Sequence, residues 1–170
     1  MPPQVDLPVG TYEEALKMIG TTTPVRTSSG AVNHAMIKLF CCTSEDANPS
    51  YWDEEAPISP PSMLIHWLLP PPWEPARPTD GRTAPEVLRT SVPLPGTAMV
   101  NVSVDHEYIR NVRVGERLSM VEELVAVSPE KQSHLGPGHY LTTKTTFFVG
   151  EETVAIETGV LFRFIPRDDA

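Results

Sequence analysis

The sequence of 170 residues has few positive charges, few cysteines and no long apolar run. Thirteen Lys and Arg residues stand against 22 Asp and Glu residues, which gives a formal net charge of −9. This balance argues against a nucleic-acid partner, because a phosphate backbone requires a basic protein face. No stretch approaches the ~18 apolar residues of a membrane-spanning helix, so we expect no membrane partner.

The two cysteines, Cys41 and Cys42, are adjacent. Neighbouring cysteines do not form an ordinary disulfide, and nothing near them has the spacing of metal ligands. Residues 1–6 lack the basic segment followed by an apolar stretch that marks a secretion signal. We therefore expect reduced thiols, no bound metal and a cytoplasmic protein. A Gly-x-Ser-x-Gly motif, typical of serine hydrolases, is also missing.

Chain length predicts one domain, which we place at residues 11–166. A flexible arm is expected at 1–10 and a polar tail at 167–170. Eight of the 19 prolines fall within residues 70–95, which we interpret as one long irregular loop.

Three helices are predicted in the first half of the chain. The first runs from Thr11 to Ile19 and ends at Gly20. The second follows an extended piece at 24–26 and is capped by Ser28 or Ser29. Helical spacing predicts that its buried face comprises Val32, Ala35, Met36, Leu39, Phe40 and Thr43.

The third helix is short, apolar and confined to residues 61–69. Proline suits its first position, and the three prolines that begin at Pro70 end it. Met63, Leu64, Trp67 and Leu68 give it an almost wholly apolar surface, as expected of a helix enclosed by other elements.

From Thr97 the pattern changes to strands. Runs rich in β-branched and aromatic residues cover 118–127 and 139–149, and Gly150 begins a tight turn into the last strand. Side chains alternate between the two faces of a strand, so in each of two strands one set of residues is expected to share a face. The first set is Val100, Val102, Val104 and His106, and the second is Val154, Ile156, Val160, Phe162 and Phe164. Helices followed by a strand meander indicate an α+β fold.

Residues 44–53, just beyond the second helix, read Ser-Glu-Asp-Ala-Asn-Pro-Ser-Tyr-Trp-Asp. This stretch resembles the hydratase signature of the MaoC-like enoyl-CoA hydratases, in which an Asp is followed by Asn-Pro and then by a His. Asp46, Asn48 and Pro49 match that pattern, but Tyr51 stands where the His belongs. A phenol, with an ordinary pKa near ~10, is a poor proton shuttle at neutral pH beside an imidazole near ~6.5.

Other stretches resemble the dehydratase N-terminal branch of the same family: Pro24-Val25-Arg26, Val32-Asn33, and Val112-x-Val114-Gly115-Glu116-x-Leu118. The Pro-Pro-x-Met-Leu-x-x-Trp run from Pro60 to Trp67 is similar to the subunit that pairs with a catalytic MaoC partner in steroid side-chain degradation. The resemblance implies a hot-dog fold, an antiparallel sheet wrapped around a short central helix.

The resemblance also implies site residues. In the family the Asp and His act on water and on the α-carbon proton of an acyl-CoA thioester, while amides at the start of the central helix polarise the carbonyl. Asp46 takes the place of the Asp, as a vestigial or supporting residue, and Tyr51 that of the His. Expected substrate contacts are Asn48, Ser62, Met63 and Trp67. No cofactor is implied, because coenzyme A enters as part of the substrate.

None of the five histidines is expected to replace the missing His of the motif, because none has a carboxylate at a spacing typical of a catalytic dyad. His66 is expected to be buried within the short helix. The hypothesis is therefore a hetero-oligomeric hydratase in which this chain shapes the pocket for a bulky acyl group and a homologous partner supplies the Asp and His. A self-sufficient hydratase, a hot-dog thioesterase using Asp46 or Glu45, and a non-catalytic acyl-CoA-binding or scaffold subunit remain alternatives.

Overall fold

The computed structural model describes residues 7–70 and 87–167. The parts of our predictions that concern the arm at 1–6, the loop at 71–86 and the tail at 168–170 lie outside the described residues. In chain order the elements are α1 (Tyr12–Leu16), β1 (Arg26–Thr27), α2 (His34–Ser44), α3 (Pro49–Trp52), the 3-10 helix η1 (Pro61–Met63), α4 (Leu64–Leu68), α5 (Leu88–Ser91), β2 (Ala98–Tyr108), β3 (Leu118–Val127), β4 (Lys131–Ser133), β5 (Gly136–Val149) and β6 (Glu152–Phe164).

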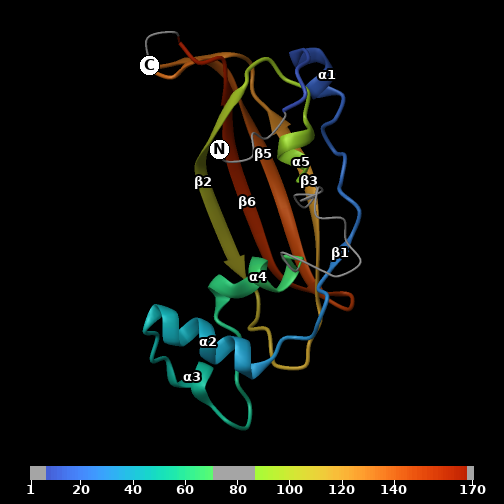
Figure 1. Cartoon of the computed structure of the whole chain (residues 1–170). Helices are drawn as coiled ribbons and strands as arrows, with labels where there is room; N and C mark the ends of the chain where they lie inside the picture. Colours follow the sequence, from blue (N-terminus) through green and yellow to red (C-terminus); the bar gives the residue numbers. More distant parts are fainter. Residues whose placement is uncertain (1–6, 71–86, 168–170) are drawn as a thin grey trace, which may run out of the picture.

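The strands form one antiparallel sheet in the order β1-β3-β5-β6-β2, with β4 paired to β5. Gly150 adopts a left-handed φ of 60° in the tight turn between β5 and β6, as the sequence predicts. β2 lies at one edge, where β6 is its pairing partner. Figure 1 shows the long strands β2, β6, β5 and β3 side by side.

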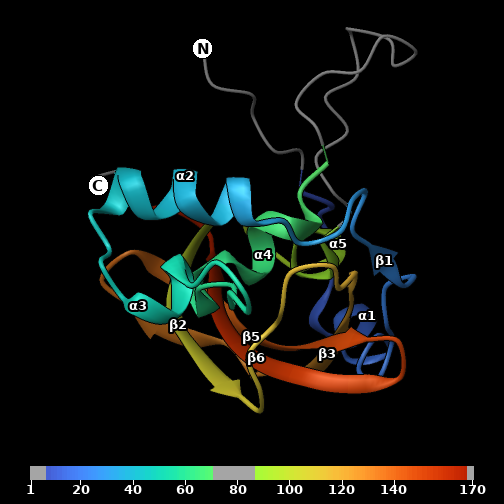
Figure 2. The same ribbon diagram turned by 90° about the horizontal axis from the view of Figure 1, so that it is seen from below.

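One apolar cluster joins α2, α3, η1 and α4 to one side of the sheet, which we call the helix-facing side. It contains Met63, Leu64 and Leu68 together with Met120 and Phe147 of the strands. Figure 2 shows α4 lying between the curved strands and α2. The predicted α+β fold, a sheet around a short central helix, is confirmed, and none of the described helices is long and apolar enough to cross a membrane.

A second apolar cluster lies farther along the same side of the sheet. Figure 1 shows α1 and α5, which contribute to it, toward the opposite end of the strands from α4. It is made by α1, by α5 with the residues that follow it, and by Leu124, Val127 and Leu141. The helix at Leu88–Ser91 corrects the prediction that residues 70–95 form one irregular loop. Burial of Leu88, Val92 and Leu94 against the sheet stabilises this piece of structure despite its prolines.

Our predictions for the cap of α2 and for most of its buried face were wrong, although Val32 is buried and Phe40 packs partly buried against the α4 cluster. Asn33 caps the helix by accepting a hydrogen bond from the Met36 amide, whereas the hydroxyl of Ser28 donates to the Gly30 carbonyl. Ile37 and Cys41 are the buried residues of α2, while Met36 and Leu39 are 48% and 58% exposed. The helix lies at the periphery and contacts the core along a narrow stripe, so it does not bury the wide face that the spacing suggested.

Two β-bulges also break the predicted alternation. A register shift between Asn101 and Ser103 places Val100 on the side of the sheet opposite to Val104 and His106. Another shift in β6 leaves Val154 buried in the α4 cluster, while Ile156, Val160, Phe162 and Phe164 keep to the other side. β4 was not predicted, and α1 ends at Leu16 rather than Ile19.

Arg163 anchors the described part of the N-terminal segment. Its side chain is fully buried and donates to the carbonyls of Pro8, Val92 and Gly96. Burial lowers the pKa of this guanidinium. Arg163 thereby links Pro8 to the segment that precedes β2.

Candidate functional site

The motif residues lie in the predicted turn after α2. Glu45 ends the helix in a left-handed conformation with φ 52°, and the Asp46 amide donates to the Cys41 carbonyl. Asp46 Oδ1 accepts from the Asn48 amide at 3.0 Å, and Asn48 Oδ1 accepts from the Ser50 amide at 3.1 Å. Asp46 and Asn48 therefore both stabilise the local backbone, which is how such short polar side chains ordinarily serve a turn.

An open hollow of about 640 Å³ adjoins this turn. The residues that line it are Cys41, Cys42, Glu45, Asp46, Ala47, Pro49 and Trp52. The indole N–H of Trp52 donates to the Asp46 carbonyl at 2.8 Å. Burial, followed by the charges of Asp46 and Cys42, raises the pKa of the Cys41 thiol, which disfavours the reactive thiolate.

Two carboxylates line this hollow, those of Glu45 and Asp46. Asp53 follows the lining residue Trp52 in the chain, whereas the Glu54 carboxylate pairs with Lys38 at 2.7 Å. Backbone amides of Ala56 and Glu55 hold the pKa of Asp53 below its ordinary value, so it is ionised at neutral pH. The phosphates of coenzyme A would be repelled here.

Tyr51 does not share the hollow with Asp46. Its side chain is 9% exposed and belongs to the core cluster around α4. His34 Nε2 lies 3.2 Å from the Tyr51 carbonyl oxygen, but His34 opens α2 and Asp46 follows its other end. A helix of 11 residues spans roughly 16 Å, so His34 cannot form a dyad with Asp46.

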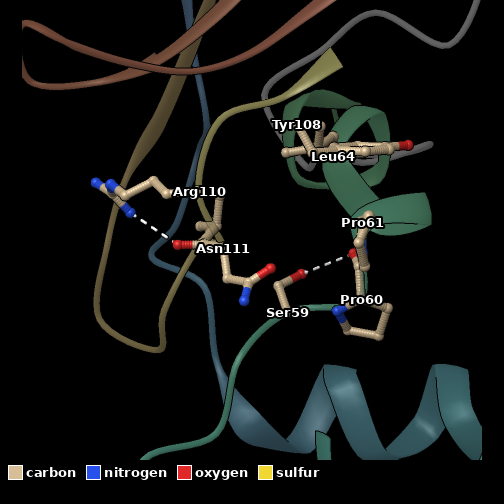
Figure 3. Close-up of a pocket in the computed structure, with 8 residues that line it drawn as sticks. Ser59, Pro60, Pro61, Leu64, Tyr108, Arg110 and Asn111 are labelled. Atoms are coloured by element: carbon tan, nitrogen blue, oxygen red, sulfur yellow. Dashed lines mark hydrogen bonds between the residues drawn. The ribbon is translucent and has the colours of Figure 1, made fainter. Parts of the chain in front are cut away.

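The start of the central helix forms a separate, very small cavity of about 10 Å³ (Figure 3). Its lining consists of Ser59, Pro60, Pro61, Leu64, Tyr108, Arg110, Asn111 and Val112. The two prolines have no N–H, and the Met63 and Leu64 amides donate to the carbonyls of Pro60 and Pro61. Among the described residues of this turn, the Ser62 amide remains as the donor available to a thioester carbonyl.

The other predicted contacts have different surroundings. Met63 is 2% exposed and packs in the core, whereas Ser62 is exposed. Trp67 is partly buried, and its indole N–H donates to Ser59 Oγ at 2.9 Å. His66 is exposed, which corrects the prediction that it is buried, and its ring meets the edge of Phe40.

Arg110 contributes a positive charge beside the small cavity, but two carboxylates neutralise it. Its guanidinium lies 3.0 Å from Glu116 Oε2 and 2.9 Å from Glu152 Oε2. These bonds raise the pKa of Arg110 and lower that of Glu152. In Figure 3 the guanidinium is directed toward the Asn111 carbonyl.

The sequence reasoning missed a histidine–carboxylate pair. His106 Nε2 lies 3.1 Å from Glu157 Oε2, and the His106 ring stacks on Tyr108 with 5.6 Å between ring centres. Burial, and secondarily the charge of Glu157, raises the pKa of Tyr108. The two paired residues are 51 positions apart, so the register between β2 and β6 was needed to find them.

The described residues contain no group of three or more His, Cys, Asp or Glu side chains placed to hold a metal ion. Comparison with known families gives a clear match. The family model of the FAS1-like dehydratase domain region matches residues 17–157. The chain belongs to the FAS1-like dehydratase domain family.

Two curated relatives are similar to this family member over most of its length. One is a "probable enoyl-CoA hydratase alpha subunit" of Thermomonospora curvata, 30% identical, with 92% of this chain and 53% of the relative aligned. The other is the "3-oxo-4,17-pregnadiene-20-carboxyl-CoA hydratase alpha subunit" of Mycobacterium tuberculosis, 27% identical, with 89% and 50% aligned. The chain spans about half the length of these relatives.

A chain of the ChsH1–ChsH2 complex from Mycobacterium tuberculosis has a similar fold. The TM-score is 0.71 at 23% sequence identity, and 91% of each chain is covered. At this identity the similarity bears on the fold alone, and it agrees with the predicted hot-dog architecture of the MaoC-like hydratases.

Proposed function

We propose that this chain is the non-catalytic subunit of a heteromeric enoyl-CoA hydratase. In this account a homologous MaoC-like subunit supplies the Asp and His that add water to a 2-enoyl-CoA, while this chain shapes the acyl pocket. The observation that carries the proposal is the division of the motif, with Asp46 beside an open acidic hollow and the Tyr51 side chain in the core. An acid–base pair needs both groups within reach of one substrate proton.

The start of the central helix supports the same proposal. A site that stabilises a developing oxyanion usually offers more than one preorganised donor. Here two prolines and two internally bonded amides leave the Ser62 amide as the donor of this turn. The adjoining cavity of about 10 Å³ is also far too small for an acyl chain, which supports a pocket completed by another protomer.

The edge of the sheet offers a surface for that protomer. β2 has 11 residues, and its β6 side carries the strand pairing. Val100, Val102, Val104 and Tyr108 are each between 38% and 52% exposed along this strand. An exposed apolar edge favours addition of a partner strand, and a homologous subunit in a heterodimer or heterotetramer would cover it.

The substrate proposed is a bulky acyl-CoA, such as a steroid side-chain thioester. The central helix is short, since η1 and α4 together span residues 61–68, and the proposal places a fused-ring group beyond its end. One curated relative is named for a steroid-CoA substrate, and the ChsH1–ChsH2 structure is a complex of two chains. Coenzyme A enters only as part of the substrate, and the exposed Arg113 and Arg117 are candidates for contact with its phosphates.

Co-expression with a homologous MaoC-like subunit tests the proposal. The purified complex should hydrate an enoyl-CoA, measured by loss of enoyl absorbance, and each subunit alone should be inactive. Unchanged hydratase activity after omission of this chain would contradict the assignment. Release of free coenzyme A without a change in enoyl absorbance would instead assign a thioesterase.

A further inference from the structure

A row of polar side chains crosses the helix-facing side of the sheet. The strand registers pair Glu122 with Thr145, Thr145 with Glu157, and Glu157 with His106. Directly paired residues point to the same side of a sheet, so these four side chains lie next to one another on β3, β5, β6 and β2. We call these four residues the polar row.

The polar row separates the two apolar clusters. On one side of it the sheet presents Met120 and Phe147 to the cluster around α4. On the other side it presents Leu124 and Leu141 to the cluster around α5. Buried polar groups are costly unless they are bonded, so a polar row between two apolar clusters requires an explanation.

Arg89 of α5 lies over the row and pairs with both of its carboxylates. Its Nε lies 3.0 Å from Glu122 Oε1, and its Nη2 lies 3.5 Å from Glu157 Oε1. Side-chain exposure rises from 2% at Glu122 to 14% at Glu157 and 33% at His106. The row is therefore closed at β3 and open toward β2, the edge proposed to meet the partner.

Gly159 occupies the position beside this network. Its φ is not left-handed, so the backbone does not require glycine, and glycine inside a strand is otherwise destabilising. A Cβ built there would have three polar atoms as its nearest neighbours: Thr143 Oγ1 at 3.5 Å, Arg89 Nη1 at 3.6 Å and Glu157 Oε1 at 3.9 Å. Glycine within a strand often marks the close approach of a ligand.

Thr143 provides a second, independent observation. It is 1% exposed, and within the described part of the chain its Oγ1 has no hydrogen-bond partner. A buried hydroxyl without a hydrogen-bond partner is destabilising. Arg89 Nη1 likewise forms none of the hydrogen bonds found among the described residues. A donor and a hydroxyl thus lie within 3.6 Å of the position that a Cβ would occupy at Gly159.

We propose that Arg89, Thr143 and Glu157 bind an oxygen substituent, a hydroxyl or a keto group, on the body of the acyl group. This proposal rests on the proposed function and adds to it the residues that would recognise an oxygen atom on the body of the acyl group. A keto oxygen would accept from Arg89 and Thr143, and a hydroxyl would also donate to Glu157.

The neighbouring residues suit the rest of such a ligand. Val104 and Tyr108 flank His106 on the same side of β2 and are about half exposed, so they offer apolar contact to a ring skeleton. Tyr108 also lines the small cavity at the start of the central helix. The polar row and the expected thioester position are therefore linked through one side chain.

Calorimetric binding to the co-purified complex tests the proposal without turnover. The probes are saturated polycyclic acyl-CoA thioesters that carry a keto group, a hydroxyl or neither. We expect the complex to bind at least one oxygenated probe about tenfold or more tightly than the unsubstituted probe, as one charge-assisted hydrogen bond implies. Equal affinities for all three would overturn the inference, as would a failure to bind any of them.

Gly159→Ala supplies the decisive variant. Its Cβ fits at ordinary contact distances but obstructs the space, so affinity for the oxygenated probe should fall about tenfold while that for the unsubstituted probe is kept. Thr158→Ala, whose side chain faces the other side of β6, is the matched control and should change neither affinity.

Thr143→Val tests the hydroxyl without adding volume. If the row is only structural, or holds only a water molecule, this variant will leave the preference for oxygen intact, and the inference is wrong. Hydration of an enoyl-CoA by the same complex is measured separately. A complex that prefers oxygenated probes but has no hydratase activity would contradict the proposed function and not the binding site.

Discussion

The Asp46 turn and the polar row are both polar clusters, but contacts of very different range hold them together. Asp46 bonds to residues two to six positions away along the chain. Glu122, Arg89, Glu157 and His106 are joined by contacts that span 33 to 68 positions. A local turn keeps its shape even if its chemistry is lost, whereas the row exists only while the sheet register and α5 are in place.

The largest loss of stability is expected for Glu122→Ala, which removes a carboxylate of the polar row. The buried carboxylate accepts from the Leu88 amide at 2.8 Å and from Arg89 Nε, and its removal leaves both donors without that acceptor. We expect a loss of about 3–5 kcal/mol in the free energy of unfolding, measured by urea denaturation. Glu123→Ala, the next residue on β3 with its side chain on the other side, is the control and should lose less than about 1 kcal/mol. Equal effects would contradict the structural role of the row.

Tyr51→Ala tests whether the Tyr51 ring belongs to the α4 cluster or to the Asp46 turn. Because the Tyr51 ring packs in the α4 cluster, its removal should cost about 3 kcal/mol of stability in the same measurement. Tyr51→Phe keeps the ring and should cost less than about 1 kcal/mol. A stable Tyr51→Ala variant would mean that the ring lies in solvent or in a ligand site instead.

Asn33→Ala should weaken the helix that presents Asp46. The Asn33 side chain caps α2 through the Met36 amide at 3.0 Å, so the expected loss is about 1 kcal/mol. Asn33→Asp keeps an acceptor at this position and should be close to neutral. A loss as large as that of Glu122→Ala would show that the Asp46 region is not locally built.

The smallest effect on stability is expected when acid protonates Glu152, the exposed partner of Arg110. The folded-state pKa of Glu152 lies below its ordinary value of 4.5, so its contribution is complete above that pH and is lost as the pH falls through the folded-state pKa. Glu152→Gln should therefore flatten the pH dependence of the melting temperature below about pH 4.5 and leave it unchanged near neutrality. If Glu152→Gln changed the melting temperature only near neutral pH, the direction given for the pKa shift would be wrong.

The elements that depend on local chemistry could be predicted from the sequence. Asp46, Asn48 and Pro49 specify their turn through short-range hydrogen bonds, and the prolines bound the short central helix. The runs of β-branched residues likewise placed β3.

Features set by tertiary packing could not be predicted in the same way. Bulges at Val102 and Val154 changed which residues share a face, and the hydrophobic residues of α2 gave no sign that the helix would lie at the periphery. The pair of His106 and Glu157 requires the register of two strands, which no local pattern encodes. The assignment of site residues, including Ser62, Met63 and Trp67, stays a prediction.

The hydration rate of the co-purified complex after changing Asp46 and Tyr51 together tests the central claim most directly. In an Asp46→Asn, Tyr51→Phe variant of this chain, kcat/KM for the enoyl-CoA should stay within about threefold of the unmodified complex, because the partner carries the acid–base pair. A loss of about 10²-fold or more, the size expected when a general acid or base is removed, would place the chemistry in this chain and contradict the account.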